Sequence, residues 1–382
     1  MNLTLETARP LPEQRAPRRL PVAETPYLVL DVPAAVTRFR RLGAALPGTA
    51  VHYAVKANPD PGLLAALAAA GCRFDVASPA EVVATLRAGA SPSDLVYSNP
   101  IKRRADIAFA ARLGVRLFVV DSIEETQKVA AAAPGSAVLC RIVTSGEGSD
   151  WSLSRKYGCS AELAVHLLRS AAAVGLDPAG VSFHVGSQQR DTAAWDAPIA
   201  AAGRVFAALR ADGLEPWLLD LGGGFPAHLE GGCLPLASYG AAIERSLRRH
   251  FGGRRPHTIV EPGRGVVADA GTLVSTVLAV VRRGDTRWVF LDAGVFTGLV
   301  ETLDESIRYR VDTSADGGPT GPCVLAGPTC DSVDVLYERV PVDLPLALGE
   351  DDTVRLHSTG AYTTCYSTVG FNGFAPLPTR HV

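Results

Sequence analysis

The sequence predicts an α/β protein, in which a (β/α)8 barrel of the TIM type is followed by a C-terminal, mostly β domain. From about residue 50, short runs of β-branched or aromatic residues alternate with stretches rich in alanine and leucine. This alternation is typical of βα units repeated around a parallel sheet. After about residue 265 it gives way to valine- and threonine-rich runs separated by glycine and proline, which are typical of a β region.

The barrel strands are expected, in chain order, over 51–56, 72–77, 95–98, 116–121, 137–143, 181–185, 217–221 and 258–261. Helices opened by serine, aspartate or proline are expected between them, over 79–88, 102–113, 122–133 and 161–174. An open, doubly wound sheet is the competing fold, but its first strand-to-helix turn should read G-x-G-x-x-G. That turn reads Lys56-Ala57-Asn58-Pro59 here, which favours the closed barrel.

The C-terminal region is expected to contain strands over 273–281, 288–292, 324–326 and 353–357. An early strand over 27–31, followed by a helix over 33–46, is expected to join the same β region. The predicted boundaries are a loose leader over 1–24, a barrel over 33–265, and a β domain made of 25–32 and 266–382.

Composition limits the function. Among 382 residues, 37 basic and 39 acidic side chains give a net charge of −2 without a basic block. Neither nucleic acid nor an anionic membrane is therefore an expected partner, and a small-molecule role is favoured. Seven cysteines without a C-x-x-C pair predict neither a disulfide framework nor a zinc site, and no metal is expected. We expect a cytoplasmic protein, because the N-terminus lacks the apolar core of a signal peptide and no later stretch suits a membrane span.

Lys56 ends the first predicted barrel strand, where a charged side chain is unusual, and it is one of four lysines in the chain. Alternation along a strand places it on the same face as His52 and Ala54. Unlike arginine, lysine can lose its proton and attack an aldehyde, as a Schiff-base lysine must. The alternative is a strand-end lysine that only extends to solvent.

Polar residues gather at the ends of most predicted strands. In a (β/α)8 barrel the active site lies at the C-terminal ends of the strands, so this convergence indicates a site. The residues are Lys56, Asp75, Ser78, Asn99, Arg141, His184, Ser187, Gly222, Gly223, Gly224, Glu261 and Arg264.

Part of this set suits a phosphorylated cofactor. The triplet Gly222-Gly223-Gly224 allows backbone N–H groups to approach an oxyanion, and Arg264 adds a positive charge near the last strands. Lys56, a phosphate cradle and the carboxylate of Glu261 together describe pyridoxal 5'-phosphate, which needs an imine lysine, a phosphate anchor and a partner for its ring nitrogen.

Nine short motifs and one acidic stretch carry a specific resemblance over nearly the whole chain. They are Y-A-V-K-A-N at 53–58, F-D-V-A-S at 74–78, S-R-K-Y-G-C at 154–159, V-S-F-H-V-G-S-Q at 181–188, L-G-G-G-F-P at 221–226, E-P-G-R at 261–264, E-T-L-D-E at 301–305, G-P-T-C-D-S at 327–332, G-A-Y-T at 360–363 and F-N-G-F at 371–374. With them the chain resembles the fold type III, pyridoxal-phosphate-dependent decarboxylases of basic amino acids, and is most similar to the short bacterial ornithine decarboxylases. The resemblance implies an alanine-racemase-like barrel, a C-terminal β domain, and a head-to-tail homodimer with two active sites at its interface.

The resemblance also implies roles for matched residues. Lys56 would hold the cofactor, His184 would stack on its ring, and Glu261 would pair with its ring nitrogen. The expected phosphate ligands are Ser187, Gly222, Gly223, Gly224, Arg264 and Tyr362, and further cofactor contacts are expected from Asp75 and Arg141.

On the substrate side, Cys330 and Asp331 would reach in from the partner subunit. The resemblance implies that the cysteine protonates Cα after decarboxylation and that the aspartate contacts the distal ammonium. Asp304 or Glu301 would supply a second carboxylate, and Phe371 would also contact the substrate. A small buried hydrophobe is the alternative for Cys330, and a solvated helix face is the alternative for Asp304 and Glu301.

Relatives that decarboxylate diaminopimelate usually read C-E-S where this chain has Cys330-Asp331-Ser332. An ammonium-binding aspartate favours ornithine or lysine, and the resemblance favours L-ornithine, with putrescine and carbon dioxide as products. Lysine, both diamino acids, or a modified basic amino acid remain alternatives. More distant alternatives are an amino-acid racemase and a catalytically silent homologue that binds a protein partner.

Overall fold

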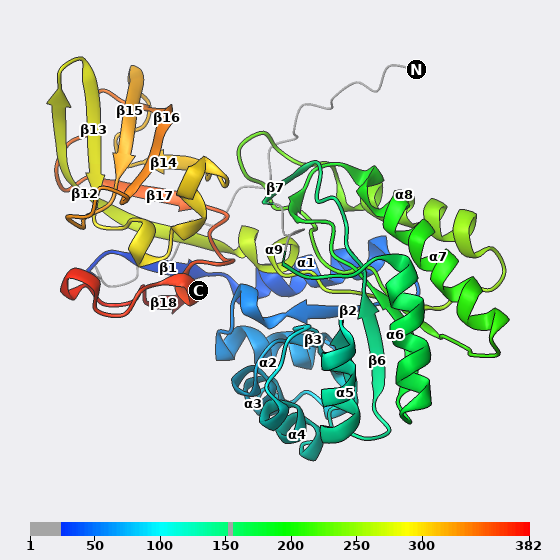
Figure 1. Cartoon of the computed structure of the whole chain (residues 1–382). Helices are drawn as coiled ribbons and strands as arrows, with labels where there is room; N and C mark the ends of the chain where they lie inside the picture. The colour runs from blue at the N-terminus through cyan, green and yellow to red at the C-terminus, as the bar shows by residue number, and fades with distance from the viewer. Residues whose placement is uncertain (1–23, 152–155) are drawn as a thin grey trace, which may run out of the picture.

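The computed structural model describes residues 24–151 and 156–382, which form a helix-covered barrel and a separate β sheet beside it (Figure 1). The predicted leader over 1–24 therefore lies outside the described residues except for Glu24. Two residues of the S-R-K-Y-G-C motif, Ser154 and Arg155, also lie outside them.

The barrel is closed by eight strands, and each strand pairs in parallel with its neighbours. They are β2 (Thr49–Ala54), β3 (Arg73–Val76), β4 (Leu95–Tyr97), β5 (Leu117–Val120), β6 (Ala137–Arg141), β8 (Asp177–Ser182), β10 (Leu218–Asp220) and β11 (His257–Val260). The prediction of a (β/α)8 barrel is thus confirmed, and the eight predicted strands are the eight that close it.

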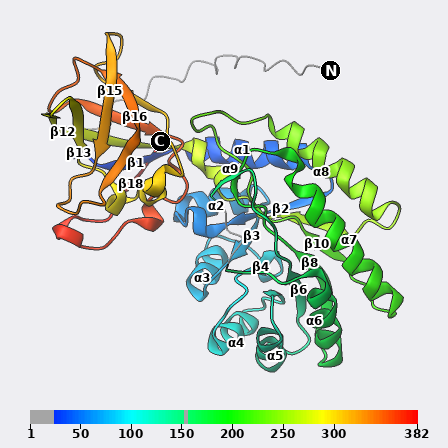
Figure 2. The same cartoon turned by 45° about the horizontal axis from the view of Figure 1, so that its top comes forward.

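Helices surround the barrel, as the tilted view in Figure 2 shows. They are α1 (Val32–Ala45), α2 (Pro61–Ala69), α3 (Pro79–Arg87), α4 (Arg104–Arg112), α5 (Ile123–Ala132), α6 (Ala161–Ala173), α7 (Asp196–Ala211), α8 (Leu236–Phe251) and the short α9 (Arg264–Val267). The side chains of Ser78, Ser122 and Ser160 accept hydrogen bonds from the N–H group three residues further on, and so cap α3, α5 and α6. Apolar side chains of the helices and of the outer strand faces form the largest core.

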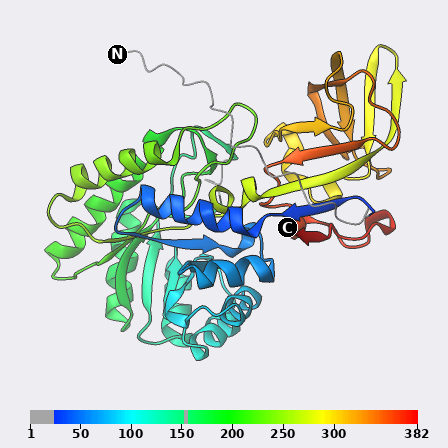
Figure 3. The same cartoon turned by 180° about the vertical axis from the view of Figure 1, so that it is seen from behind.

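The second sheet has eight strands, in the order β14-β17-β12-β13-β15-β16, with β1 paired to both β12 and β18. Its members are β1 (Tyr27–Leu30), β12 (Gly271–Arg283), β13 (Thr286–Leu291), β14 (Val311–Thr313), β15 (Thr320–Ala326), β16 (Val335–Pro345), β17 (Thr353–His357) and β18 (Thr379–His381). From behind, β1 leads from this sheet directly into α1 on the barrel (Figure 3). A further pair, β7 (Ser149–Trp151) and β9 (Ser187–Gln189), lies on the barrel side. The boundaries 33–265, 25–32 and 266–382 stay predictions.

No helix within the two described ranges combines the length and apolarity that a bilayer crossing requires.

The contact between α1 and α8 depends on a glycine. A Cβ placed on Gly240 of α8 would lie 1.9 Å from the carbonyl oxygen of Ala45, at the end of α1. A Cβ placed on Gly43 of α1, by contrast, would have no other atom within 4 Å among the described residues. Both glycines lie within helices and have the same conformational freedom, but only Gly240 is in close contact with a neighbouring helix.

We expect Gly240→Ala to lower the free energy of unfolding by about 2 kcal/mol, because α8 must move away from α1. Gly43→Ala is the matched control and should raise stability by about 0.5 kcal/mol or more through its better helix propensity. Urea unfolding of both variants, followed by circular dichroism, measures the difference. Equal shifts in the two midpoints would show that the close approach is unimportant.

Candidate active site

Lys56 lies in a tight turn and not on the strand. β2 ends at Ala54, and Val55–Ala57 form a 3-10 turn, so the predicted strand was two residues too long. The N–H of Ala54 donates to the carbonyl of Pro262, and the N–H of Tyr362 donates to the carbonyl of Ala57. The turn is therefore held by the segment after β11 and by the C-terminal segment together.

The Lys56 ammonium faces a buried acid at the C-terminal end of the barrel. Its Nζ donates to Oδ2 of Asp75 at 2.5 Å, and Asp75 is the register neighbour of Ala54 on β3. Burial alone lowers the pKa of Lys56, but the charge of Asp75, followed by Tyr362 and Glu261, raises that pKa above its ordinary value. Lys56 is thus protonated in this arrangement, and a proton must leave before its amine can act as a nucleophile.

Glu261 and Asp220 are two acids near this lysine, and the charge of Asp220 acts on Glu261. Glu261 follows β11, and its Oε1 accepts a hydrogen bond from the Ser98 hydroxyl. Burial, followed by the charges of Asp220 and Asp75, raises the pKa of Glu261 well above its ordinary value, and burial also raises the pKa of Asp220. The two acids can therefore hold a proton at this end of the barrel at neutral pH.

Asp220 is a site residue that the sequence reasoning missed. It ends β10, immediately before the glycine triplet, and its Oδ1 accepts the N–H of Gly222 at 2.9 Å. The signal available in the sequence was an acid within the apolar run Leu218-Leu219-Asp220-Leu221, where a lone charge must find a partner.

His184 follows β8 as a neutral ring. Its Nδ1 lies 3.0 Å from the N–H of Gly186, which donates to it, and the proton of the neutral ring therefore belongs on Nε2. Burial, followed by the charges of Arg141 and Lys56, lowers the pKa of His184 to about 3. Arg141, at the end of β6, lies 5.7 Å from the centre of the Tyr157 ring. A neutral, partly buried imidazole is suited to lie against a flat ligand.

The glycine triplet forms a turn that only glycine permits at two positions. Gly222 and Gly224 have φ angles of +66° and +103°, and a Cβ on Gly222 would lie 1.9 Å from the carbonyl oxygen of Phe183. A Cβ on Gly223 would lie 3.1 Å from Nε2 of His184, so this turn and the histidine ring are adjacent. The N–H groups of Gly223 and Gly224 donate to no described residue and remain free for an oxyanion.

Arg264 is a buried cation near this turn. Its Nε donates to Oγ of Ser187 at 3.2 Å, and its Nη2 donates to both carboxylate oxygens of Glu301 at 2.6 and 2.8 Å. The guanidinium lies 5.1 Å from the centre of the Tyr362 ring. Its Nη1 has no partner among the described residues, so one buried donor is left for a ligand.

Three of the predicted substrate contacts, Cys330, Asp331 and Phe371, are exposed residues of the C-terminal region. Cys330 and Asp331 are exposed in the loop after β15, where the Cys330 N–H donates to Oδ1 of Asn372 at 3.2 Å. Phe371 lies beside Asn372 and packs on Phe296, with ring centres 4.5 Å apart. Within the described part of the chain, no hydrogen bond or ion pair joins Cys330 or Asp331 to the Lys56 group.

The two acids proposed as second substrate carboxylates have different surroundings. Glu301 is buried and bonded to Arg264, so it is neither a solvated helix face nor, in this arrangement, free for an ammonium. Asp304 is 81% exposed and pairs with Arg339 at 3.0 Å. The sequence could not show the Glu301 contact, because its partner lies 37 residues away in the chain.

These groups fit pyridoxal phosphate by their chemistry. Lys56 offers an amine, and the free N–H groups of the glycine turn with Nη1 of Arg264 offer donors to a phosphate. The pair Glu261 and Asp220 offers a protonated partner for a ring nitrogen. Oδ1 of Asp75 is a further buried atom without a partner among the described residues.

Comparisons with known proteins agree with this chemistry. Residues 34–268 match a protein-family model described as the pyridoxal binding domain of pyridoxal-dependent decarboxylases. A lysine/ornithine decarboxylase of Selenomonas ruminantium is 35% identical over 365 residues, which cover 95% of this chain and 90% of that protein. A chloroplastic ornithine decarboxylase of Nicotiana glutinosa is 34% identical over 94% of this chain and 84% of that protein.

Solved structures give the same answer. A crystal structure of SrLDC in complex with PLP and cadaverine is 34% identical, with a TM-score of 0.86, and covers 95% of this chain and 91% of that one. The lysine/ornithine decarboxylase of Vibrio vulnificus, complexed with cadaverine, is 33% identical, with a TM-score of 0.85 over 94% of each chain. The predicted family, fold and cofactor are therefore confirmed, and the chain belongs to the fold type III, pyridoxal-phosphate-dependent decarboxylases of basic amino acids.

Proposed function

We propose that this enzyme converts L-ornithine to putrescine and carbon dioxide, as a homodimer whose active sites combine residues of both subunits. The observation that carries the proposal is the exposure of Cys330 and Asp331 away from the Lys56 group of the same chain. Both residues are available to a second copy, and an aspartate is the chemical partner of a distal ammonium.

On the cofactor side, Lys56 would provide the amine for the covalent link, and Asp75, which accepts the hydrogen bond of Lys56, would balance charge beside it. Glu261, which accepts a hydrogen bond from Ser98 and lies near the acid Asp220, would pair with the ring nitrogen. When bound, pyridoxal phosphate supplies an electron-poor ring that accepts the electron pair left by departing carbon dioxide.

The remaining cofactor contacts are proposed in two groups. The neutral ring of His184 would lie against the ring of the cofactor, and Arg141, whose charge acts on His184, would contribute from the end of β6. The phosphate ligands are Ser187, Gly222, Gly223, Gly224, Arg264 and Tyr362.

On the substrate side, the Cys330 thiol of one subunit gives a proton to Cα in the active site of the other. Asp331 accepts the distal ammonium, and Phe371 provides an apolar wall next to the same loop. We propose Asp304 as the second carboxylate, since its exposed pair with Arg339 is readily exchanged. Glu301 can reach the ammonium only if it leaves Arg264.

Lysine is the second candidate substrate, because the 35% identical relative is named a lysine/ornithine decarboxylase. One methylene changes the binding free energy by only about 1 to 3 kcal/mol, so activity on both diamino acids is compatible with the same site. A modified basic amino acid is the third candidate. The racemase loses support, because the matched family model describes a decarboxylase domain. The catalytically silent homologue stays an alternative, since a protein of Xenopus laevis named antizyme inhibitor 2 is 31% identical over 93% of this chain.

Amine and carbon dioxide release by the pyridoxal-phosphate-loaded enzyme tests the substrate. With ornithine, lysine, arginine and diaminopimelate compared, we expect kcat/KM for ornithine to exceed that for lysine about tenfold, as one methylene allows. A lysine preference would contradict ornithine while leaving the enzyme class intact. Failure of all four would direct the search to modified basic amino acids.

Lys56→Arg tests the covalent role with little change in local charge. Arginine keeps a cation beside Asp75 but cannot lose its proton, so we expect turnover and the visible absorbance of the lysine-bound cofactor to disappear. Lys56→Ala should give the same loss, and thermal unfolding of both variants controls for folding. Retained activity in either variant would exclude Lys56 as the covalent anchor.

Mixed dimers test the shared site. When Lys56→Ala and Cys330→Ala subunits are mixed in equal amounts, half of the dimers contain one intact site, so we expect recovery to about a quarter of wild-type activity. A mixture of Lys56→Ala with Lys56→Arg is the control and should recover nothing. Absence of recovery in the first mixture, with subunit exchange demonstrated, would refute a site built from two subunits.

A further inference from the structure

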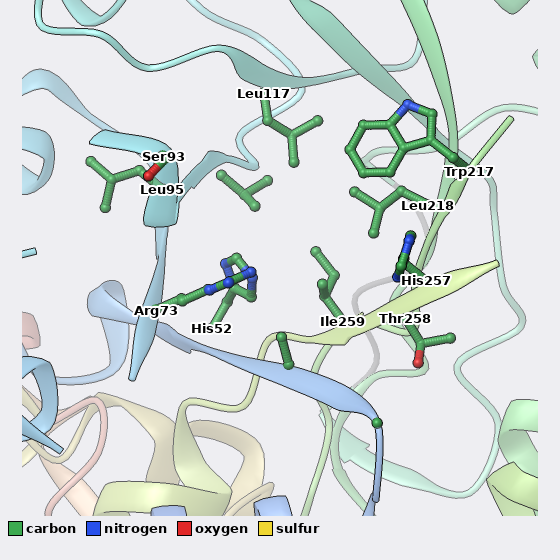
Figure 4. Close-up of a pocket in the computed structure, with 13 residues that line it drawn as sticks. His52, Arg73, Ser93, Leu95, Leu117, Trp217, Leu218, His257, Thr258 and Ile259 are labelled. Atoms are coloured by element: carbon green, nitrogen blue, oxygen red, sulfur yellow. The ribbon is translucent and has the colours of Figure 1, made fainter. Parts of the chain in front are cut away.

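A cavity of about 240 Å³ lies at the N-terminal ends of the barrel strands, opposite to the Lys56 group (Figure 4). Its walls are mainly apolar and come from strands around the barrel. The apolar wall residues include Leu95 of β4, Leu117 of β5, Leu218 of β10 and Ile259 of β11. The catalytic groups proposed above end the same strands at their other side, so this space is separate from the active site.

His52 of β2 is a buried polar group that lines this cavity. It is 3% exposed, and neither ring nitrogen has a hydrogen-bond partner among the described residues. Burial, followed by the charge of Arg73, lowers the pKa of His52 to about 3, and the backbone of Phe74 opposes this only in part. The ring is therefore neutral, and apart from the weak backbone contact at Phe74 neither its N–H donor nor its acceptor nitrogen has a partner among the described residues. Buried polar groups are rarely left in that state without a bound partner.

Arg73 adds a positive charge at the same side of the cavity. It is the register neighbour of His52 on β3, and Figure 4 shows both side chains on one side of the cavity, with Leu117, Leu218 and Ile259 facing the same space. Its side chain is 50% exposed and reaches Asp94 only at 3.4 Å. Such a loose, solvated ion pair is readily exchanged for another anion.

The cavity thus has a polar corner at His52 and Arg73 and a mainly apolar remainder, into which Ser93, His257 and Thr258 add further polar groups. Several wall residues, such as Arg73 and Trp217, are exposed, so the cavity is open to solvent and a ligand would displace water from its apolar part. Its size also suits an organic ligand, since an apolar cavity of about 150 Å³ already accepts benzene. A ring or a branched chain with one anionic group would satisfy both the apolar wall and the polar corner.

We propose that this cavity is a second binding site, which takes a small carboxylate with an aromatic or branched apolar body. The carboxylate lies at Arg73 and accepts the N–H of His52, and the body lies among Leu95, Leu117, Leu218 and Ile259. This site goes beyond the proposed decarboxylation and does not depend on it.

Calorimetric titration of the cofactor-loaded enzyme with benzoate tests the site. We expect saturable binding, weakened about tenfold or more by Arg73→Gln, because a hydrogen bond to a charged group is lost. Arg169→Gln is the matched control, since Arg169 is 51% exposed and also pairs with a single aspartate, Asp212. It should leave the affinity for benzoate unchanged, and decarboxylase activity should persist in both variants.

Two substitutions of His52 and a second, uncharged ligand test whether the N–H of His52 and the charge of the ligand contribute to binding. His52→Phe should abolish benzoate binding, whereas His52→Gln, which keeps an N–H donor, should retain part of it. Benzyl alcohol, which has the ring without the charge, should bind at least about tenfold more weakly than benzoate. Even if His52→Phe fails to fold, the Arg73 variants and benzyl alcohol still decide the question.

A crystal structure of the enzyme with benzoate should show the ring in this cavity. Three results would overturn the proposal: no measurable binding, the same affinity in wild type and Arg73→Gln, or a cavity that contains only water at His52 in the benzoate crystal.

Discussion

The active site depends on one electrostatic constraint: three carboxyl groups, of Asp75, Asp220 and Glu261, are enclosed at one end of the barrel with a single lysine among them. The Lys56 ammonium neutralises Asp75, and the other two acids relieve their repulsion by holding a proton, as their raised pKa values indicate. Oδ1 of Asp75 and Nη1 of Arg264 still lack partners among the described residues. A cofactor with an anionic phosphate and a basic ring nitrogen would complement the unpaired donor of Arg264 and the protonated acids. Its binding should therefore stabilise the folded chain.

Much of the fold was predictable because it follows from local patterns. Buried parallel strands are continuous β-branched or aromatic runs, and the helices after them are opened by serine caps such as Ser78 and Ser122, so all eight barrel strands could be found. The exact end of β2 was not predictable, because the turn at Lys56 is imposed by hydrogen bonds from Tyr362 and to Pro262, both distant in sequence. The side-chain partners could not be predicted for the same reason. Asp220 and Glu261 come together only when the barrel closes, and Arg264 pairs with Glu301 only when the sheet packs beside the barrel.

The Arg264 and Glu301 pair also shows how the two parts of the molecule are connected. Arg264 begins α9, directly after the last barrel strand, whereas Glu301 belongs to the segment between β13 and β14 of the sheet. A buried ion pair of this kind is strongly destabilising to break on one side only, because it leaves an uncompensated charge. The phosphate ligand proposed for the cofactor is therefore also one of the residues that connect the sheet to the barrel. This arrangement makes the geometry of the phosphate site dependent on the sheet, although most of the cofactor contacts come from the barrel.

Two histidines of the barrel, His52, which is buried, and His184, which is partly buried, are both neutral but differ in their hydrogen bonds. Burial, followed by nearby cations, lowers the pKa of both His184 and His52 to about 3. His184 receives the N–H of Gly186 and lies beside the glycine turn, so its neutral ring is already oriented for a ligand. His52 lies on β2, the strand that leads to Lys56, but at the N-terminal end of the barrel. Residues at that end of a TIM barrel ordinarily contribute to stability only, and an apolar side chain would suffice for that. A neutral imidazole whose ring nitrogens lack well-formed hydrogen bonds among the described residues contributes nothing to packing that leucine would not. Its presence therefore argues for a ligand and not for the fold.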